Sequence, residues 1–550
     1  MVDGAPSEIS FHDPSERRGL SRDNRRMVAW TILIVLHLMT GILFLSDRSP
    51  GTNAALTGFP LDDTWIHLVY GRSLAEYGMP FYNDGELEAG FTSPMWMIFT
   101  GMAELVHKAG VAPAYIILKL FSLFVSMIGS IVLYELCLTV SQSIYPSLFV
   151  AGLFAALPMN AFSQLSGMEV NLTALLITVA CLSYILKRFR YTGYSFAAAY
   201  LSRPETIVFL PVVILMMVFT ERRSVKDKPL LLLRYSAYIA GPTIIVGLSW
   251  MTYCLFVNGH PLPNTFYVKY GTGVSIPGIG RALREFMREI SPFKFGAGII
   301  LYIFGFAVLV RRREFSGITI SLFPWIYIAA VGGSRPLPQG CGSYFYWWRY
   351  WAPGVALLAL PLVSGAALLW ETRSGIGGVF RDRDGWIRPF RTLAIVIGLL
   401  MVGPYIRDFP TFSHTFAWNC QNINEVNVAI GRWIDEHVGQ DEAVLVNDAG
   451  AIRYFGKRKT IDLFGLNNHE LLFSPSRGKV FRTDAVELEK LARHNSGKYL
   501  VIFPPWFKQL IQSDEFKMLF DPLYFFESEH YTVVPGDAQS KMFIFMRKSP

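Results

Sequence analysis

The stretch Phe59-Pro-Leu-Asp62-Asp63-Thr-Trp-Ile-His67 lies shortly after an apolar span, Met27 to Leu45. That span is long enough to cross a bilayer, whose hydrocarbon core is about 30 Å thick. Asp62 and Asp63 therefore begin a segment just beyond a membrane helix, and apolar residues at helical spacing follow them. Two adjacent carboxylates in this position indicate a reaction site at the membrane surface. The alternative is that Asp62 only caps the next helix, because Asp favours the N-cap and the first turn.

The composition defines the class of protein. The chain has 550 residues, of which 52% are hydrophobic and 17% charged, and its mean hydropathy is +0.34. Soluble domains usually contain about 25% charged residues, so the chain is predicted to be a polytopic α-helical membrane protein. The net charge of +8 fits loops that face an anionic cytoplasmic leaflet, and nucleic acid is not expected as a partner. No cleavable signal peptide is expected, because residues 1–26 are polar.

The distribution of basic residues predicts the topology. A cationic cluster before Met27 places residues 1–26 in the cytoplasm and the aspartate pair outside. We expect a transmembrane domain over 27–407 with a first outer loop at 46–111, in which residues 94–109 lie along the interface. About eleven membrane helices follow from this scheme, at 27–45, 112–139, 144–160, 168–186, a half-length pair in 191–219, 232–257, 292–310, 315–332, 350–370 and 391–407.

The remaining residues, 408–550, are predicted to form an extracytoplasmic α/β domain. Buried strands are expected at 442–447, 499–503 and 541–546, and helices at 432–437 and 485–494. The turn Asp448-Ala-Gly at the end of the first strand contacts a ligand or packs on the membrane domain, and the second interpretation is at least as good. No Gly-rich nucleotide-binding loop occurs in this segment.

Several charged residues fall on the same outer face as the aspartate pair. Charges near membrane depth are costly, so they are candidates for function. Each also has a structural interpretation: Arg203 and Glu205 as a local ion pair, Lys269 as an interfacial lysine, and Arg349 as part of an aromatic belt. Glu169 fits a first-turn acid, and His260 fits an ordinary loop histidine.

The ordered motifs resemble the bacterial GT-C superfamily of polyprenyl-phosphate-sugar-dependent glycosyltransferases, in particular its arabinofuranosyltransferase branch. The motifs are Asp62-Asp63-Thr-Trp-Ile, Gly90-Phe-Thr-Ser-Pro-Met-Trp96, Ser166-Gly-Met-Glu169, Ser202-Arg-Pro-Glu205, Pro261-Leu-Pro-Asn-Thr-Phe-Tyr-Val-Lys269 and Asp448-Ala-Gly-Ala-Ile-Arg-Tyr-Phe455 with Ile461-Asp-Leu-Phe-Gly-Leu466. The family often has Glu directly before the glycine of the second motif, where this chain has Ala89 and, one place earlier, Glu88.

The resemblance implies a GT-C-like fold and an inverting transfer of a sugar from a polyprenyl-phosphate donor at the outer face of a bacterial inner membrane. The acceptor would be a cell-envelope glycan, a lipid or a protein. Because phosphate is a good leaving group, such a site needs a general base but no general acid. Asp62 is the first choice for the base and Asp63 the second; one of them could instead hold a divalent metal such as Mg²⁺ or Mn²⁺.

The other candidates surround these two carboxylates. The donor phosphate is expected to bind cations, which are Arg203, Lys269, His260 and Arg349. Supporting roles in the site are expected for Glu88, Glu169, Glu205 and Asn264.

A second class of function stays open, a transporter or flippase of lipid-linked saccharides. Such a protein would also need cations and aromatic residues near lipid, but it predicts inverted repeats with paired broken helices. We recognise no such repeat. A further prediction concerns Cys341 and Cys420, which the topology places outside, where disulfides persist; pairing and chance occurrence are about equally favoured.

Overall fold

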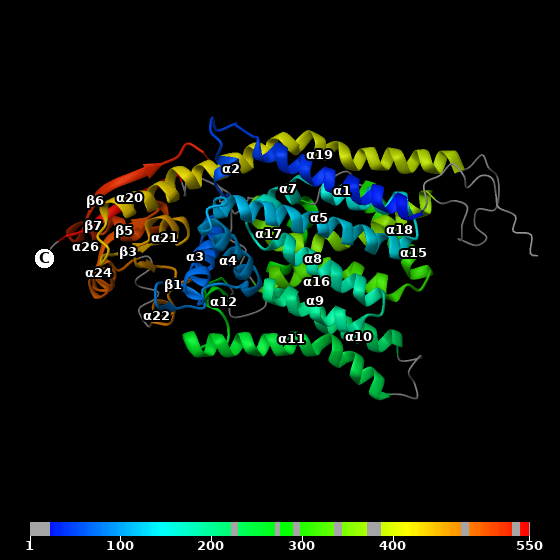
Figure 1. The fold of residues 1–550 in the computed structure, drawn as a ribbon, viewed down its shortest axis with the longest axis horizontal. Helices are drawn as coiled ribbons and strands as arrows, with labels where there is room; N and C mark the ends of the chain where they lie inside the picture. The colour runs from blue at the N-terminus through cyan, green and yellow to red at the C-terminus, as the bar shows by residue number, and fades with distance from the viewer. Residues whose placement is uncertain are drawn as a thin grey trace, which may run out of the picture.

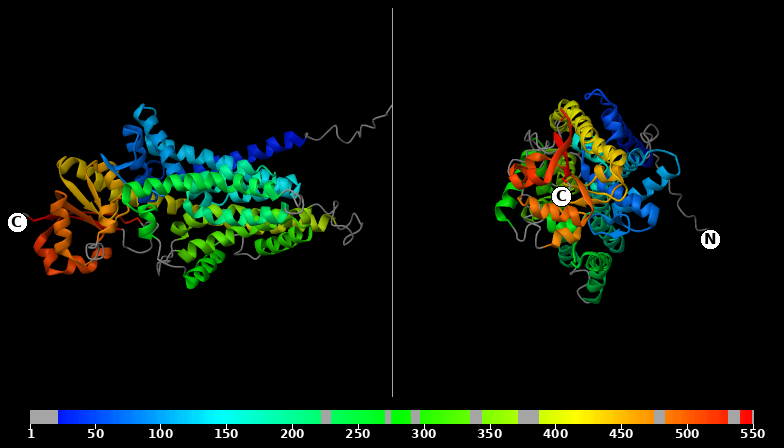
Figure 2. Two further views of the ribbon diagram at one scale, coloured as in Figure 1. Left: turned by 90° about the horizontal axis from the view of Figure 1, so that it is seen from below. Right: turned by 90° about the vertical axis from the view of Figure 1, so that its left-hand side faces the viewer.

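The computed structural model describes residues 22–221, 229–269, 275–289, 297–334, 344–370, 387–474, 483–530 and 540–548. It shows a long bundle of helices with a small sheet at one end (Figures 1 and 2). A short helical segment, built from the first loop, lies between the bundle and the sheet (Figure 1). The chain thus has a polytopic helical part and a C-terminal mixed α/β part, as predicted.

The helices of the bundle run in both directions along its length (Figure 1). They are α1 (Arg22–Leu45), α5 (Ala114–Ser141), α6 (Ile144–Ala155), α7 (Pro158–Leu165), α8 (Val170–Ile185), α9 (Phe189–Ser202), η2 (Pro204–Val208), α10 (Phe209–Glu221), α11 (Pro229–Asn258), α13 (Ile276–Glu289), α15 (Ala297–Arg311), α16 (Phe315–Ser334), α17 (Tyr344–Val355), η3 (Ala356–Leu358), α18 (Ala359–Trp370) and α19 (Ile387–Ile423).

Within the described residues, seven helical segments are long and apolar enough to cross a membrane, or eight if the bent pair α6–α7 is one span. This number is lower than the eleven we predicted, because α8, α9 and α15 are shorter than a full crossing. The predicted half-length pair in 191–219 corresponds to α9 and α10, which meet at a break at Arg203. Its second half, with η2, reaches 18 residues and could cross.

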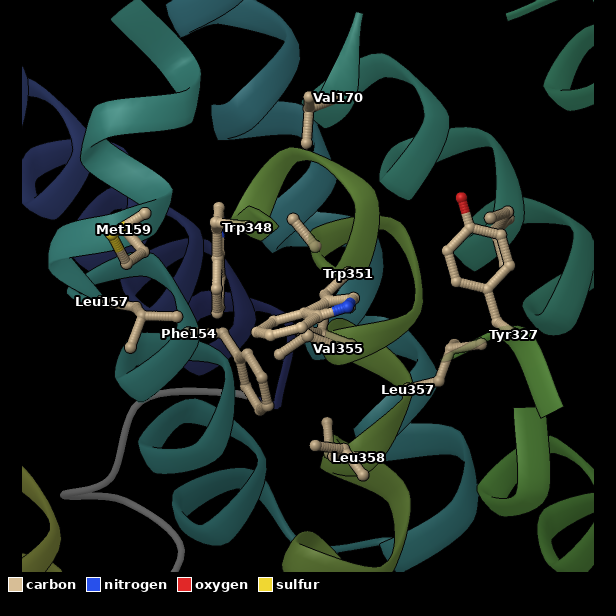
Figure 3. Close-up of a cluster of buried hydrophobic side chains, with 14 of the residues drawn as sticks. Phe154, Leu157, Met159, Val170, Tyr327, Trp348, Trp351, Val355, Leu357 and Leu358 are labelled. Carbon is tan, nitrogen blue, oxygen red and sulfur yellow. The ribbon is translucent and has the colours of Figure 1, made fainter. Parts of the chain in front are cut away.

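The core of the bundle is built around α17 and η3. Trp348, Trp351 and Val355 are buried, and Figure 3 shows them packed beside Phe154 and Leu157, which come from α6 and the link to α7. Large rigid aromatic side chains fix a helix in rotation as well as in position. This packing therefore determines where the neighbouring Arg349 on α17 can point.

The first loop forms α2 (Ala54–Thr57), α3 (Asp62–Tyr77), the hairpin β1 (Phe81–Asn83) and β2 (Glu86–Leu87), and α4 (Pro94–Lys108). Helix α3 begins with two acids in its first turn, which favour a helix N-terminus. It ends at Gly78, whose φ of 69° lies in the left-handed region that suits glycine. Helix α4 packs on α3 and is not among the segments able to cross a membrane. That segment 94–109 lies along the interface stays a prediction.

The sheet has five strands in the order β4-β3-β5-β7-β6. They are β3 (Ala443–Val446), β4 (Thr460–Asp462), β5 (Gly497–Ile502), β6 (Phe520–Glu527) and β7 (Lys541–Arg547). Strand β3 is parallel to β4 and β5, whereas β7 is antiparallel to β5 and β6. The helices of this part are α20 (Ala429–His437), α21 (Ala451–Gly456), α22 (His469–Phe473), η5 (Pro504–Phe507), α24 (Ala485–His494), α25 (Lys508–Gln512) and α26 (Asp514–Leu519).

Helix α19 connects the two parts without a loop. It runs from Ile387 to Ile423 and continues through a π-helical turn, Asn424–Val428, into α20. Position 408, which we took as the domain boundary, lies inside α19. Cys420, near the end of α19, is a buried thiol. The predicted pairing with Cys341 stays a prediction, because Cys341 lies outside the described residues.

Candidate functional site

The motifs of the sequence meet at the end of the bundle that faces the sheet. Thr64 of α3 donates to the carbonyl oxygen of Ser166 (2.8 Å), and Trp96 Nε1 donates to that of Gly167 (2.9 Å). Ser93 donates to the carbonyl oxygen of Ser202 (2.6 Å). Gly167 has φ of 74°, and a side chain there would meet Thr64 at 2.4 Å. The close contact between α3 and the segment before α8 therefore requires glycine.

Asp62 faces the C-terminal region. Its Oδ2 accepts a hydrogen bond from the Gly450 amide (2.7 Å), and its Oδ1 accepts one from the Ala451 amide (2.8 Å). These amides open α21, so Asp62 caps a helix 388 residues away from it, and its own helix has Leu61 at the N-cap. A Cβ at position 450 would lie 2.1 Å from the Asp62 carbonyl oxygen. The turn Asp448-Ala-Gly is thus a contact with the first loop, as its structural interpretation predicted.

A second carboxylate lies beside Asp62. Asn427 Nδ2 donates to Asp448 Oδ2 (3.0 Å) and lies 3.4 Å from Asp62 Oδ1, so the amide connects the two acids. Burial raises the pKa of Asp62 to about 6. Burial and the charge of Asp62 raise the pKa of Asp448 well above its ordinary value. Asp62 thus joins the first loop to α21, and Asn427 connects it to Asp448 just after β3.

A cavity of about 560 Å³ lies on the other side of the aspartate pair, and we call it the α3–α11 cavity. Asp63 lines it and Asp62 does not. One wall is apolar and comes from η2 and α11, with Ile207, Ile244 and Leu248 between 42% and 58% exposed. In a membrane these side chains would face lipid, so the cavity combines an apolar, lipid-side groove with a charged end.

Asp63 forms the centre of the charged end. Arg349 Nη1 lies 2.6 Å from Asp63 Oδ2, and Lys269 Nζ lies 3.4 Å from the same oxygen. Burial favours a higher pKa for Asp63, but Lys269 and Arg349 lower its pKa below the ordinary value, so this carboxylate is ionised. Lys269 and Asp63 are each close to 30% exposed on the side chain. Both are therefore accessible to a ligand in the cavity.

Arg203 forms a second group with two acids. It pairs with Glu169 Oε1 at 2.7 Å and with Glu205 Oε1 at 2.6 Å. His67, four residues after Asp63 on α3, places its Nε2 3.6 Å from Glu169 Oε2. All four residues line the α3–α11 cavity. The local ion pair between Arg203 and Glu205 is thus present, and the guanidinium is also shared with Glu169.

Three of the predicted site residues, Glu88, Asn264 and His260, do not line the cavity. Asn264 Nδ2 donates to Glu88 Oε2 (3.0 Å), and Glu88 Oε1 pairs with His469 Nδ1 (2.9 Å). These contacts hold α12 (Asn264–Lys269) against the first loop and so position Lys269. His260 stacks on the ring of Phe473, with 3.7 Å between ring centres. It does not line the α3–α11 cavity, so the structure does not place it with the other cations.

Sequence reasoning missed His67, Tyr350 and Asn427. His67 could have been predicted, because it follows Asp63 by four residues and therefore lies on the same face of the helix. Tyr350 lies between two guanidinium groups, with Arg203 Cζ 5.2 Å and Arg349 Cζ 4.9 Å from its ring centre. Nothing in the sequence near Asn427 indicates its role, because its hydrogen bond to Asp448 forms only when the chain folds.

The fit of a divalent metal can be tested on the same geometry. In the part of the chain that the structure describes, no group of three or more His, Cys, Asp or Glu side chains is placed to hold a metal ion. The cavity carboxylates Asp63 and Glu169 already face cations. We therefore derive no step through a metal, and the predicted Mg²⁺ or Mn²⁺ stays a prediction.

Comparison with known proteins identifies the fold. A family model described as a domain of unknown function, DUF8728, matches residues 421–544. No curated protein matches the chain. Solved structures of low sequence identity do match it.

The oligosaccharyltransferase of Archaeoglobus fulgidus in its apo form is 12% identical with a TM-score of 0.54, over 87% of this chain and 70% of that one. ArnT of Cupriavidus metallidurans bound to undecaprenyl phosphate is 11% identical with a TM-score of 0.52, over 94% and 98%. The Archaeoglobus enzyme tethered to an acceptor peptide is 11% identical with a TM-score of 0.54, over 91% and 73%. The chain therefore has a GT-C-like fold, that of membrane proteins with several spans and a C-terminal α/β region.

Proposed function

We propose that the chain is an inverting glycosyltransferase that moves a sugar from a polyprenyl-phosphate donor to a cell-envelope glycan, lipid or protein. The supporting observation is the α3–α11 cavity, which places an apolar, lipid-side wall next to Asp63, Lys269 and Arg349. A lipid phosphate needs both an apolar groove for its chain and cations for its head. The shared fold with ArnT bound to undecaprenyl phosphate supports the same assignment.

The charged end of the cavity suggests how the reaction would proceed. The phosphate binds Lys269 and Arg349, and Arg349 offers a planar guanidinium for two oxygens. The bound phosphate then competes with Asp63 for Lys269 and Arg349. The pKa of Asp63 therefore rises towards its ordinary value, and its carboxylate becomes a better base. Asp63 takes the proton of the acceptor hydroxyl as that oxygen bonds to the sugar C1 and the C1–phosphate bond breaks.

We assign the general base to Asp63 in place of our first choice, Asp62. Both oxygens of Asp62 accept backbone hydrogen bonds from α21 and its N-cap, whereas Asp63 lines the cavity. Arg203, Glu169, Glu205 and His67 form the wall next to the reacting sugar. The ordered motifs alone lead us to propose an arabinofuranosyl-type donor, with the site at the outer face of a bacterial inner membrane.

A transfer assay with a panel of polyprenyl-phosphate sugars tests the proposal. Asp63→Asn should lower turnover at least about 10²-fold, the lower range for lost general-base catalysis, while donor binding is retained. Asp408→Asn, an ion-paired carboxylate outside the cavity, is the matched control. A wild-type protein that transfers no sugar but moves lipid-linked saccharides across liposome membranes would favour the flippase instead.

A further inference from the structure

A second cavity lies on the opposite face of α3. It has a volume of about 490 Å³ and is enclosed by α3, the β1 hairpin, α4 and α21, and we call it the α3–α4 cavity. Asp63 and His67 face the α3–α11 cavity, whereas Arg72 and Glu76 face this one. Because successive residues turn by about 100° around a helix, these two pairs lie on different faces. Helix α3 therefore separates the two cavities.

The floor of the α3–α4 cavity is a set of oriented polar groups. Tyr454 donates its hydroxyl to the buried carboxylate of Glu104 (2.8 Å), and the guanidinium of Arg72 lies over the Tyr454 ring at 3.7 Å. Arg453 is also buried, donating to the Tyr82 carbonyl oxygen and to Asp84 Oδ1, both at 3.0 Å. Arg72 also interacts electrostatically with the Glu104 carboxylate and with the Tyr454 hydroxyl. Its guanidinium is held in place and keeps N–H groups for a ligand.

The rim of this cavity is aromatic and charged. Tyr77 is 52% exposed, and its ring centre lies 5.8 Å from that of Phe81. The lining contains four cations and three carboxylates. The cations are Arg72, Lys108, Arg453 and Lys457, and the carboxylates are Glu76, Asp84 and Glu104. Because the positive and negative charges of this lining nearly cancel, it is poorly suited to bind a polyanion. The volume lies within the range of about 300–1,000 Å³ that is usual for small-ligand sites.

We propose that the α3–α4 cavity binds a neutral oligosaccharide, namely a segment of the acceptor glycan away from the hydroxyl that reacts. Planar guanidinium and carboxylate groups match pairs of neighbouring hydroxyls, which both donate and accept. Exposed aromatic faces pack against the C–H face of a sugar ring. The class of ligand thus follows from the side chains, but its role as acceptor rests on the proposed function.

The position of the cavity fits such a role. Arg72 follows Asp63 by nine residues on α3, which is about 14 Å along the helix at 1.5 Å per residue. The two cavities lie on different faces of α3, so a glycan held in the α3–α4 cavity needs several further sugar units to pass around the helix and present its end near Asp63. The cavity would then select acceptors by length.

Binding to an array of neutral oligosaccharides, measured without any donor, tests the site directly. Wild type and Asp63→Asn should bind the same glycans, and Arg72→Ala and Tyr77→Ala should bind them at least about tenfold more weakly, a loss of about 1.4 kcal/mol. Tyr145→Ala, which replaces a tyrosine of similar exposure on α6, should bind as wild type does. Tyr77 is exposed, so its variant is expected to fold even if Arg72→Ala does not.

The same variants can be followed in the transfer reaction. Tyr77→Ala should raise KM about tenfold for a long acceptor and leave KM and kcat for a single-sugar acceptor unchanged. The absence of glycan binding by wild type, or binding that both cavity variants retain, would overturn the proposal. Because the array contains no donor, glycan binding without transfer would contradict the proposed function and leave the saccharide site standing.

Discussion

Asp62 and Asp63 are neighbours in the chain but contact different parts of the protein. One step along a helix turns a side chain by about 100°, so Asp62 reaches α21 while Asp63 lines the α3–α11 cavity. The pKa of Asp62 is raised by burial, whereas that of Asp63 is lowered by Lys269 and Arg349 in spite of burial. A pair of adjacent acids can therefore provide one structural and one chemical group.

The cations of the cavity are expected to differ in the same way. Lys269 is partly exposed and lies 3.4 Å from Asp63, whereas Arg203 is buried between Glu169 and Glu205. Lys269→Ala should weaken donor binding by about 1.5–3 kcal/mol, the usual value of a charge-assisted contact, with little change in Tm. Arg203→Ala should instead lower Tm, because it leaves two carboxylates without their cation.

Donor affinity by calorimetry and Tm of the purified protein measure both effects. Lys498→Ala, which removes an exposed lysine that pairs with Glu442 in the sheet, is the control for Lys269→Ala. Equal donor affinities for Lys269→Ala and wild type would contradict this assignment of the phosphate site.

Asp462, at the end of β4, should make stability depend on pH. It is fully buried and accepts hydrogen bonds from the Phe464 and Asn467 amides, and burial raises its pKa from 3.8 to about 6. The folded chain therefore holds this proton more tightly than the unfolded chain does. Its contribution to stability is greatest below about pH 4, falls by about 3 kcal/mol as pH rises to about 6, and is constant above that.

Thermal unfolding of wild type and Asp462→Asn between pH 4 and pH 8 measures this contribution. The Tm of wild type relative to the variant should decrease up to about pH 6 and then stay level. A difference in Tm that is the same at every pH would show that Asp462 has an ordinary pKa.

At the scale of elements, α11 provides the wall on which a lipid chain would lie. Gly247 lines the α3–α11 cavity, and a Cβ there would make ordinary contact with Tyr200 at 3.6 Å. Gly247→Phe should fill the groove and raise KM for a long polyprenyl donor about tenfold or more, but not for a donor with one or two isoprene units. The expected loss corresponds to the burial of a few methylene groups, at about 0.8 kcal/mol each.

Gly241→Phe is the matched control, because it lies on the same helix and a Cβ there meets nothing within 4 Å. Steady-state kinetics with long and short donors measure both variants. If Gly247→Phe affects both donors equally, the groove does not hold the lipid chain.

Some elements were predictable from the sequence because their pattern is local. Strands β3 and β5 are apolar runs between turns, and α24 begins at Ala485, directly after Asp484, whose side chain caps it. Strand β6 was missed because it contains Pro522 and is mostly exposed, so that it has no buried alternation. Strand β4 was missed because it has only three residues.

The candidate site was predictable in composition but not in arrangement. The motifs and the charged residues on the outer face indicated which residues meet, and Asp63, Lys269, Arg203, Glu169 and Arg349 do line one cavity. The role of Asp62 depends on amides 388 residues away, and His260 is held by Phe473 of the C-terminal region. Such contacts follow from tertiary packing and leave no pattern in the sequence near either residue.

At the scale of the whole molecule, the orientation in the membrane can be tested. Helices α1 and α19 begin at the end of the bundle away from the sheet (Figure 1). Arg26 and Arg391 lie near the starts of the candidate spans in these two helices, and Arg311 ends the shorter apolar helix α15. The positive-inside rule predicts that these ends are cytoplasmic and that the sheet is outside. The side of the membrane on which each helix end lies can therefore be measured.

Labelling of single cysteines in intact cells measures the orientation. In a background in which the five native cysteines are replaced by serine, a membrane-impermeant maleimide should label Glu529→Cys and not Arg312→Cys. Both native side chains are exposed, so accessibility does not limit either reaction. Labelling of Arg312→Cys alone would reverse the topology and move the site to the cytoplasmic side.

Helix α19 gives the molecule a mechanical property. Its 37 residues extend about 55 Å at 1.5 Å per residue, which exceeds the hydrocarbon thickness of about 30 Å. The apolar part of this helix tilts when the bilayer becomes thinner, and the sheet at its far end follows to the extent that the helix does not bend at Pro404 and Pro410, which lie inside it. Bilayer thickness would thereby set the strain on the contact between Asp62 and α21, so that the protein would work as a lever driven by its lipid environment.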